Sequence, residues 1–453
     1  MANDAGVATG PEAPPKGLLA SVLAPVSALL LSVSILLMGS GLQGTLLPVR
    51  GNLESFSPLS LGILGTSFFL GFTIGCFHGP LLLRRSGHIR VFLAMTSVAS
   101  VTSLLHAVYV DPVAWWVFRV LTGYCFAILY IVIESWLNAQ SNNQTRGTVF
   151  AIYTAINLTV ITAGQMMLGL ADPNSFILFA VSSILVSLAA LPVAFTVHAS
   201  PVITELARPR LRKLLAVSPV GVAGCFAVGL ANGAFWSLGP VFAQDEGFTL
   251  TEIAAFMSAV VLGGAVAQWP LGSISDRMDR RIVIVASAVI ALIAALAIQL
   301  LSFDDKLIIV LISVVFGAGA FPLNTLSVAH ANDFADPSQC VEVSSGLLLV
   351  YGIGATIGPL LAAVWQETSS YQTLFFFTAI VHAILIVYVI WRMSQREAAP
   401  AEDRAVFSDI AIAAQTVMPF DPIGAGNTGE EVEPELGPDR EPETVGELAN
   451  DER

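Results

Sequence analysis

The sequence predicts an all-α polytopic membrane protein with 12 transmembrane helices in two pseudo-symmetric six-helix bundles. Three observations support this prediction. The 453 residues are 55% hydrophobic and only 12% charged, whereas soluble proteins carry about 25% charged residues. Twelve apolar segments each exceed the roughly 20 residues that a helix needs to cross the hydrocarbon core of a bilayer. Lys and Arg gather in alternate connections, and features of the first half recur in the second.

The apolar segments follow one another with short polar connections. A helix is the expected form of each, because a spanning helix satisfies its own backbone hydrogen bonds in lipid. The first segment is longer than the core of a signal peptide, so we expect it to remain as an uncleaved first helix. The segments cover about residues 20–49, 58–79, 89–109, 112–137, 148–170, 175–197, 214–241, 251–271, 281–302, 306–330, 338–364 and 371–392.

The distribution of Lys and Arg predicts the orientation in the membrane. One set of connections holds 14 of these residues, and the opposite set holds only Arg50 and Lys306. Connections rich in Lys and Arg face the cytoplasm. We therefore expect a multi-pass protein of the cell inner membrane or plasma membrane with both termini in the cytoplasm. The 14 residues are Lys16, Arg84, Arg85, Arg90, Arg146, Arg208, Arg210, Arg212, Lys213, Arg277, Arg280, Arg281, Arg392 and Arg396.

The two halves of the chain repeat each other. Pro48-Val49 recurs as Pro240-Val241, 192 residues later. Internal repeats of this kind are typical of membrane transporters built from two related bundles. The expected division is a cytoplasmic tail at 1–19, bundles at 20–197 and 214–393, a basic cytoplasmic connection at 198–213 and an acidic cytoplasmic tail at 394–453.

The formal net charge of −13 comes from the second tail. Residues 397–453 hold 15 of the 33 acidic residues and three arginines, a net of −12, and the rest of the chain is left with −1. The tail is rich in Pro, Gly and Glu, so we expect it to be largely disordered. The acidity therefore says nothing about the charge of a substrate, and the composition gives no sign of a nucleic-acid partner.

The most informative stretch runs from Gln268 to Arg281. It contains Gly272, Asp276, Arg277, Arg280 and Arg281 at fixed spacing between two apolar segments. We expect a tight charged turn between two transmembrane helices. The pattern resembles the cytoplasmic loop signature of the major facilitator superfamily, Gly-x-x-x-Asp-Arg-x-Gly-Arg-Arg, with Asp279 where the family usually has glycine. The resemblance implies a cytoplasmic gate, in which Asp276 caps a helix of the other half near Arg146-Gly147.

The first half carries a degenerate copy of the signature. Arg84 stands where the family has the aspartate, and Arg85 follows it. An arginine cannot cap a helix N-terminus. The loop 331–342 carries three acids and no Lys or Arg, so we hypothesise that Arg84 or Arg85 pairs with it across the halves. The three acids are Asp333, Asp336 and Glu342.

The fourth segment carries two charges on one stripe. Arg119, Gly123, Ala127, Tyr130 and Glu134 follow steps of four, four, three and four, so they share one helical face. A charge in lipid costs at least about 2.5–3.5 kcal/mol, which favours placing this face inside the bundle. At ~1.5 Å per residue, the two charges stand roughly 22 Å apart.

The Arg119-x-x-x-Gly123-x-x-x-Ala127 pattern resembles helix 4 of proton-coupled members of the superfamily. That resemblance implies an electrostatic role for Arg119 and a titrating or gating role for Glu134. Two alternatives stay open. Arg119 can be an anchor bonded to backbone carbonyls, and Glu134 can form a gate ion pair with Arg146.

Glycines at matching places in the first and seventh segments suggest interrupted helices around a central site. These are Gly39, Gly41 and Gly44, then Gly229 and Gly233. The polar and aromatic residues of the spans are candidates for its cavity, with few fixed charges among them. Such a cavity suits a neutral or amphiphilic organic solute. The candidates are Gln43, Asn157, Gln165, Asn232, Trp236, Gln268, Asn324 and Tyr351.

The stretch Glu134–Asn138, Arg146-Gly147 and Gln268–Pro270 are similar to the YcaD-type branch of bacterial carriers. The resemblance implies a secondary active transporter of a small organic solute that works by alternating access as a monomer. It implies proton coupling, with the proton gradient as energy source and no cofactor or metal. Efflux is one open direction. An uncoupled or uptake facilitator and a non-transporting membrane sensor remain alternatives. No catalytic motif occurs, so an enzyme is not expected.

Overall fold

The computed structural model describes residues 26–141, 145–195, 211–301, 305–336, 339–369 and 373–397. Within these ranges, 12 helices are long and apolar enough to cross a membrane, and no strand occurs. The expected all-α polytopic fold is therefore confirmed. Both tails beyond these ranges and residues 198–210 of the connection lie outside the described residues.

The first half supplies six spans. The sixth is made of two helices that meet at Ala189, and the fifth continues into a 3-10 turn over Met167–Leu170. The helices are α2 (Ser27–Leu53), α3 (Pro58–Ser86), α4 (His88–Val108), α5 (Pro112–Ala139), α6 (Arg146–Met166), α7 (Ile177–Leu188) and α8 (Ala190–Ala194).

The second half begins with the short helix α9 (Leu211–Val217) and supplies six further spans. Pro322 divides the fourth of these into two helices. The helices are α10 (Pro219–Asp245), α11 (Leu250–Arg277), α12 (Arg280–Leu300), α13 (Lys306–Ala320), α14 (Pro322–Asn332), α15 (Cys340–Thr368) and α16 (Leu374–Met393).

Several helix starts follow from local sequence signals. Ser57 and Ser218 each accept a hydrogen bond from a backbone N–H of the first turn, and each is followed by a proline. A proline fits there because its missing N–H would have no partner in the helix. Thr249 and Glu252 form a reciprocal capping box at the start of α11. The chain therefore fixes these ends locally, before any packing.

The repeat of the sequence is also a repeat of the helices. Adding 192 to the bounds of α2 gives the bounds of α10, and adding 192 to those of α4 gives those of α12. The offset that relates Pro48 to Pro240 therefore holds over whole spans. Each of these prolines lies inside its helix.

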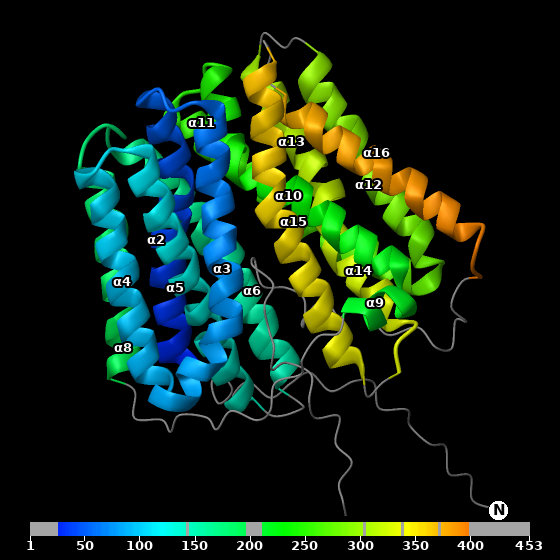
Figure 1. Ribbon diagram of the computed structural model, residues 1–453, viewed down its shortest axis with the longest axis horizontal. Helices are drawn as coiled ribbons and strands as arrows, with labels where there is room; N and C mark the ends of the chain where they lie inside the picture. The colour runs from blue at the N-terminus through cyan, green and yellow to red at the C-terminus, as the bar shows by residue number, and fades with distance from the viewer. Residues whose placement is uncertain are drawn as a thin grey trace, which may run out of the picture.

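The helices form two groups that meet along a seam (Figure 1). Across the seam, α3 packs against α15, α6 against α11 and α2 against α10. The internal repeat relates α2 to α10, and it exchanges the other two pairs, since α3 corresponds to α11 and α6 to α15. In Figure 1 the groups touch in the upper part of the view and diverge toward the lower part.

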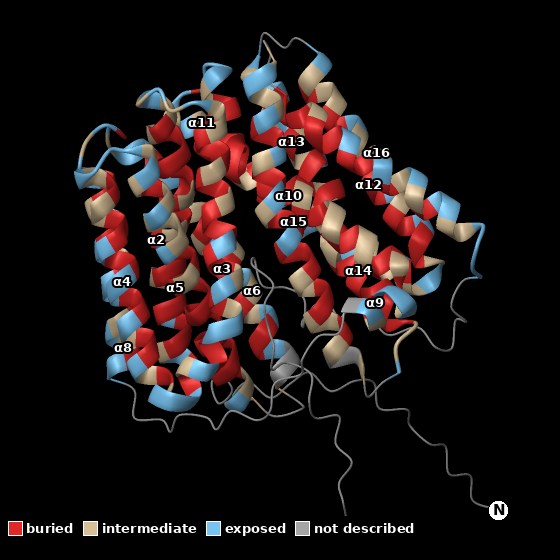
Figure 2. Cartoon of the chain, viewed as in Figure 1, coloured by how far each residue is buried: buried red, intermediate tan, exposed pale blue. Residues whose placement is uncertain are grey.

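The outer surface is that of a protein solvated by lipid. Buried residues line the interior of both groups, and exposed residues follow their outside (Figure 2). Many exposed side chains are large and apolar, such as Leu262, Trp269, Ile384 and Val387. A soluble protein rarely exposes so much apolar surface.

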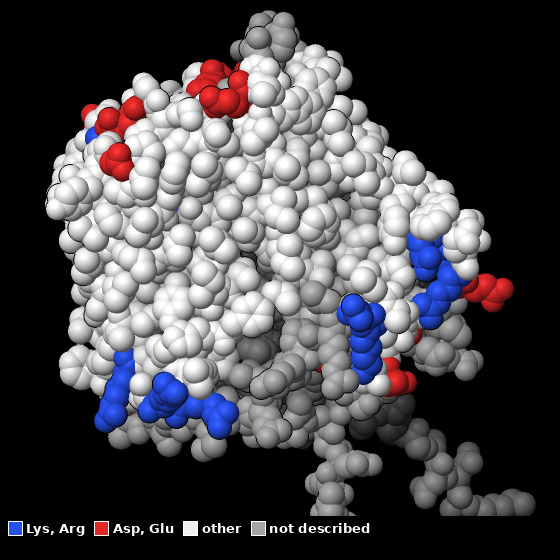
Figure 3. All heavy atoms as spheres, viewed as in Figure 1, with Lys and Arg blue, Asp and Glu red and all other residues white. Residues whose placement is uncertain are grey.

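Charged residues gather at the two ends of the helices (Figure 3). Lys and Arg lie along the lower edge and the right side of the view, where a few acidic residues accompany them, and acidic residues predominate along the upper edge. We call the lower end the basic face and the upper end the acidic face. Exposed residues of the basic face include Arg84, Arg85, Arg90 and Arg277, and those of the acidic face include Asp111, Asp172, Asp245 and Glu367.

The expected interruptions of the first and seventh spans do not occur. Both α2 and α10 are continuous. Gly41 instead lets α2 approach α6, since a Cβ there would lie 2.4 Å from the carbonyl oxygen of Ile161. Gly229 in α10 would meet the carbonyl oxygen of Tyr351 at 2.3 Å. These glycines permit close helix packing, as small residues do between membrane helices.

Candidate binding site between the two halves

Hydrogen bonds close the seam near the acidic face. The Asn52 amide donates to Gln244 Oε1 at 3.1 Å and to Asp245 Oδ1 at 2.8 Å. The backbone N–H of Leu59 donates to Glu367 across the seam at 3.1 Å. We call these hydrogen bonds, together with the close packing at Gly62 and Gly65, the outer seal.

Close backbone contact reinforces the outer seal. A Cβ on Gly62 would lie 2.1 Å from the Cβ of Ala363 and 2.7 Å from the carbonyl oxygen of Pro359. A Cβ on Gly65 would lie 2.0 Å from Ser237 Oγ. Since α3 could not approach α15 and α10 so closely with larger residues, these two glycines are required for this conformation.

Toward the basic face the surface is hollowed between the two groups (Figure 3). A pocket lies at the depth where the outer seal ends, and it encloses about 710 Å³ of empty space, part of it open solvent. Because the space is open on one side, this figure is an upper limit to the volume that the protein itself encloses.

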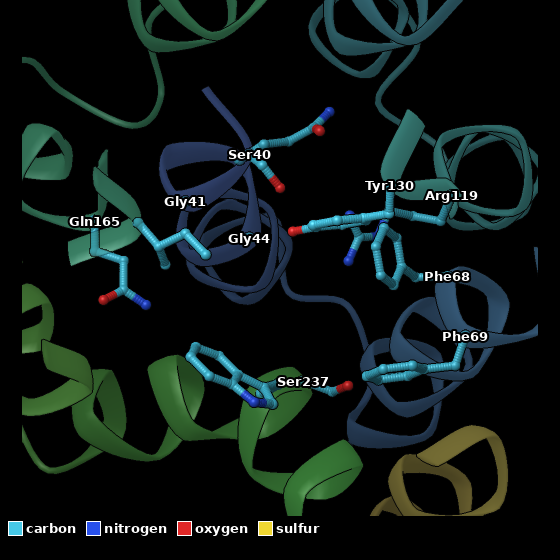
Figure 4. A pocket seen from close by; sticks show the side chains of 12 residues that line it. Ser40, Gly41, Gly44, Phe68, Phe69, Arg119, Tyr130, Gln165 and Ser237 are labelled. Atoms are coloured by element: carbon cyan, nitrogen blue, oxygen red, sulfur yellow. The ribbon is translucent and has the colours of Figure 1, made fainter. Parts of the chain in front are cut away.

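Both halves line the pocket (Figure 4). Helices α2, α3, α5 and α6 contribute from one side, and α10 contributes from the other. The polar lining residues are Ser40, Gln43, Arg119, Tyr130, Gln165 and Ser237. The remaining lining residues are Gly41, Gly44, Phe68, Phe69, Ile161 and Trp236.

Arg119 is the one charged residue that lines this pocket. Its guanidinium carbon lies 4.3 Å from the centre of the Phe68 ring. Within the described residues Nε is buried without a hydrogen-bond partner, and the side chain makes no ion pair. The alternative that Arg119 is an anchor bonded to backbone carbonyls is therefore not seen. Its charge faces the pocket without a counter-charge.

Glu134 lies deep in the first half. Its side chain is 1% exposed, and the Tyr153 hydroxyl donates to Oε1 at 3.4 Å. One helical turn earlier, Tyr130 lines the pocket, and Figure 4 shows its hydroxyl directed into the space. Tyr130 therefore stands between the pocket and the buried carboxylate. The alternative ion pair with Arg146 involves a side chain that lies outside the described residues.

The face of α5 that carries Arg119, Gly123, Ala127, Tyr130 and Glu134 packs against α3. It therefore lies inside the first half, as expected from the cost of a charge in lipid. A Cβ on Gly123 would lie 2.0 Å from the carbonyl oxygen of Phe68, and Ala127, Tyr130 and Glu134 are buried. This close approach brings Phe68 and Phe69 of α3 beside Arg119. The spacing of the stripe was visible in the sequence, but its partner helix was not.

Three of the eight cavity candidates line the pocket. Gln43 donates to Ser103 Oγ at 3.0 Å, inside the first half. Gln165 accepts a hydrogen bond from Ser258 of the opposite half at 3.4 Å. Trp236 lies in the wall formed by α10, with its ring 5.9 Å from that of Phe321.

The structure places the other five candidates away from this pocket. Gln268 donates to Thr325 at 3.1 Å, and Asn232 lies beside Tyr351. Asn157 is fully buried beside Tyr153 in the first half. The side-chain carbonyl oxygen of Asn324 is buried without a hydrogen-bond partner within the described residues. These residues belong to the interiors of the two halves.

The sequence reasoning missed five lining residues: Ser40, Phe68, Phe69, Ile161 and Ser237. Two of them had a local signal. Ser40 stands between Gly39 and Gly41, and Ser237 follows Trp236, which was a candidate. The two phenylalanines carry no signal in the sequence, because apolar residues fill every face of a spanning helix.

The tight turn expected within the stretch 268–281 is shorter than the stretch itself. Helix α11 continues to Arg277, and Met278 and Asp279 alone separate it from α12. Arg280 is 1% exposed and lies in an ion cluster, with Asp333 at 2.7 Å, Asp276 at 3.0 Å and Ser275 Oγ at 2.8 Å. Three elements of the second half are thus joined at the basic face. Asp276, which was expected to cap a helix near Arg146-Gly147, pairs with Arg280 in this structure.

Asp279, at the position of the family's glycine, holds the second arginine. Its carboxylate accepts hydrogen bonds from Arg281 at 2.7, 3.0 and 3.1 Å and also caps the start of α12. The backbone φ at this position is −58°, so no glycine is required there. Arg281 also donates to the carbonyl oxygen of Arg396 at 2.6 Å.

The hypothesised pairing of Arg84 or Arg85 across the halves is not made in this conformation. Asp333 pairs with Arg280, and Glu342 pairs with Lys213 at 3.3 Å, all within the second half. Arg84 and Arg85 are exposed at the end of α3. The separation of the two groups toward the basic face is the physical reason.

Residues 29–348 match the family model described as Major Facilitator Superfamily. An uncharacterized MFS-type transporter of Enterobacter sp. (strain 638) is 25% identical over 374 residues, which cover 81% of this chain and 95% of that protein. The uncharacterized MFS-type transporter YcaD of Escherichia fergusonii is 24% identical over 368 residues, with the same coverage.

Solved structures share the fold at low sequence identity. The nucleoside transporter NupG has a TM-score of 0.69 at 13% identity, covering 82% of this chain and 99% of that chain. A bacterial homolog of the human lysosomal transporter Spinster has a TM-score of 0.67 at 14% identity, covering 86% and 99%. The E. coli fucose:proton symporter FucP has a TM-score of 0.53 at 16% identity, covering 82% and 99%.

Proposed function

Because this chain belongs to the Major Facilitator Superfamily of membrane transporters, we propose that it is a secondary active, proton-coupled transporter of a small organic solute. Alternating access is the mechanism we propose: the halves at 20–197 and 214–393 rock about the pocket between them. The observation that carries this proposal is a pocket lined by both halves, sealed toward the acidic face and bordered by a hollow toward the basic face.

The side assignment follows from the charges. We propose that the basic face, with both termini, lies on the cytoplasmic side of the cell inner membrane, as the positive-inside rule requires. The structure then corresponds to a cytoplasm-facing state. In the opposite state, the outer seal would open and the basic ends of the two halves would approach each other.

We propose that α5 carries the residue that couples transport to protons. Glu134 is a buried carboxylate next to two tyrosines, and Tyr130 links its surroundings to the pocket. A buried acid in a membrane protein is a candidate proton carrier, since its neutral form avoids the penalty of a charge in apolar surroundings. We propose that Glu134 exchanges its proton as the halves change position. The proton gradient is the proposed energy source, with no cofactor, in a monomer.

The test is a flux assay in proteoliposomes that contain a pH-sensitive dye, with a panel of neutral, cationic and anionic solutes. Solute-dependent proton movement that is lost in Glu134→Gln supports the proposal. Solute movement without protons would replace it with an uncoupled facilitator. Ligand binding without flux of either kind would replace it with a membrane sensor. Comparing inside-out and right-side-out vesicles then distinguishes efflux from uptake.

A further inference from the structure

The pocket wall holds a cation and no acid. Arg119 is its one charged side chain, and no Asp or Glu lines the pocket among the described residues. Along this helix, the acids on either side of Arg119 are the exposed N-cap Asp111, roughly 12 Å away, and Glu134, roughly 22 Å away. A cationic solute would therefore meet like charge in apolar surroundings, where charge repulsion is strongest.

The guanidinium of Arg119 is prepared for an anion. Phe68 covers one of its faces at 4.3 Å, which orients the plane but uses none of its N–H donors. No hydrogen bond or ion pair within the described residues engages these donors. Guanidinium groups bind carboxylates through two parallel hydrogen bonds. A charge left unpaired in such a site is unfavourable, and a bound carboxylate relieves this.

The rest of the wall indicates what is attached to the anion. Phe69 and Trp236 offer aromatic surface from opposite halves. The Tyr130 hydroxyl points into the space and adds a hydrogen-bond donor near Arg119 (Figure 4). Binding pockets of this kind combine apolar walls with a few oriented polar groups.

We propose that the pocket binds an organic carboxylate, with its carboxyl group on Arg119 and an aromatic or similarly flat apolar body against Phe69 and Trp236. This inference rests on the proposed transport function and names its substrate class. It replaces the neutral or amphiphilic solute expected from the sequence, because the structure leaves Arg119 without a partner. Since both halves contribute to the pocket, such a ligand would bridge the two parts that move.

The experiment measures binding rather than flux, by titration calorimetry on the full-length protein in nanodiscs. The probes are 3-phenylpropanoate, indole-3-acetate and 2-naphthylacetate, each compared with its amide and with the amine that has the same ring. We expect at least one carboxylate to bind roughly tenfold to hundredfold more tightly than its amide, the range expected for hydrogen bonds to a charged group. The amine should bind weakest.

The variants separate the guanidinium from the rest of the pocket. Arg119→Gln should remove the preference for the carboxylate and leave the affinity for the amide unchanged. Arg119→Lys keeps the charge without the planar fork and should retain a reduced preference, so it serves as a second test if the glutamine variant does not fold. Arg90→Gln removes an exposed arginine far from the pocket and is the matched control.

The proposal is overturned if no carboxylate binds, if an amide or amine binds as tightly, or if Arg119→Gln keeps the preference. Its failure is distinguishable from failure of the transport proposal. Amides or amines that bind and move with protons would retain transport and reject the substrate class. Carboxylates that bind through Arg119 but are never transported would retain the site and reject transport.

Discussion

Asn52 and Gln244 occupy the same position in the two halves, 192 residues apart, and are joined by a hydrogen bond of 3.1 Å across the seam. Two equivalent residues of the internal repeat are therefore in direct contact, near the acidic face. The bond exists only while the two halves are in contact there. It belongs to the outer seal, together with the Asn52 bond to Asp245.

Removing this contact should favour the opposite state. Asn52→Ala loses two hydrogen bonds, each contributing up to about 1 kcal/mol, so the balance between states should shift by roughly fivefold to thirtyfold. Spin labels at exposed Ser86 and Met278, in a background without native cysteines, would report the spacing of the basic ends. We expect shorter distances in the variant. Asn174→Ala on the same face is the control, and equal distances in both variants would contradict the role of Asn52.

Gly62→Ala should prevent closure of the outer seal. The added methyl group would overlap the Cβ of Ala363 and the backbone of Pro359, and backbone cannot give way as a flexible side chain can. We expect transport to fall to background while the protein still folds and spans the membrane. Gly239→Ala is the control, because its new Cβ meets side chains alone, the Met257 sulfur and the Phe235 ring, each at 3.2 Å. Full transport by Gly62→Ala would show that the outer seal can still form when the added methyl group holds α3 and α15 farther apart.

Glu134→Gln should separate proton movement from solute binding. The substitution keeps the shape and the hydrogen bond from Tyr153 but cannot release a proton. We expect proton flux to disappear and ligand affinity to persist, since Glu134 does not line the pocket. Glu54→Gln near the acidic face provides the control. Undiminished proton flux in Glu134→Gln would move the coupling site elsewhere.

Arg280→Met should destabilise the second half. It leaves the carboxylate of Asp333 buried without its closest cation, a change that typically costs about 3–5 kcal/mol. Thermal unfolding of the purified protein measures the loss. The double variant Arg280→Met with Asp333→Leu should regain much of it, because no buried charge is then left unpaired. Arg277→Met, at an exposed position, is the control and should unfold at the same temperature as the wild type. If Arg280→Met also unfolded at the wild-type temperature, the ion cluster would have no structural role.

Asp279 should make the stability of the basic face dependent on pH. Burial raises the pKa of its carboxyl. The hydrogen bonds and the charge of Arg281 lower this pKa by a larger amount, so the net pKa lies below the usual value. Its stabilising effect is therefore complete above the ordinary aspartate pKa, about 3.9, and is lost as pH falls through the lower folded value.

Asp279→Asn keeps a side chain that can cap α12 but removes this titration. The wild type should unfold at a higher temperature than the variant at pH 7, and the difference should shrink as the pH falls below 4. A constant difference over this range would mean that the charge of Asp279 does not contribute.

How much the sequence could predict is clearest at the stretch 268–281. Its residue types and spacing gave the family resemblance, and Arg280 and Arg281, which the resemblance singled out, form ion pairs in the structure. The expected tight turn between two helices occurs, but it is confined to Met278 and Asp279, because α11 continues to Arg277. Intrahelical hydrogen bonds satisfy the backbone whether the side chains are charged or apolar, so composition alone does not end a helix at a membrane boundary.

The sequence by itself determined the 12 spans, the constant offset of the repeat and the separation of charge between the two faces. Hydropathy, spacing and local capping are properties of neighbouring residues, so they can be read along the chain. Only the tertiary structure decided that Gln43, Gln165 and Trp236 reach the pocket while Asn157 and Tyr351 do not. It also decided that Gly41 and Gly229 pack helices rather than break them. The reason is that the rotation of a helix and its partner helices decide which of its faces is buried. Every face of a membrane helix is apolar enough to lie either inside the protein or against lipid, so the sequence does not distinguish the two.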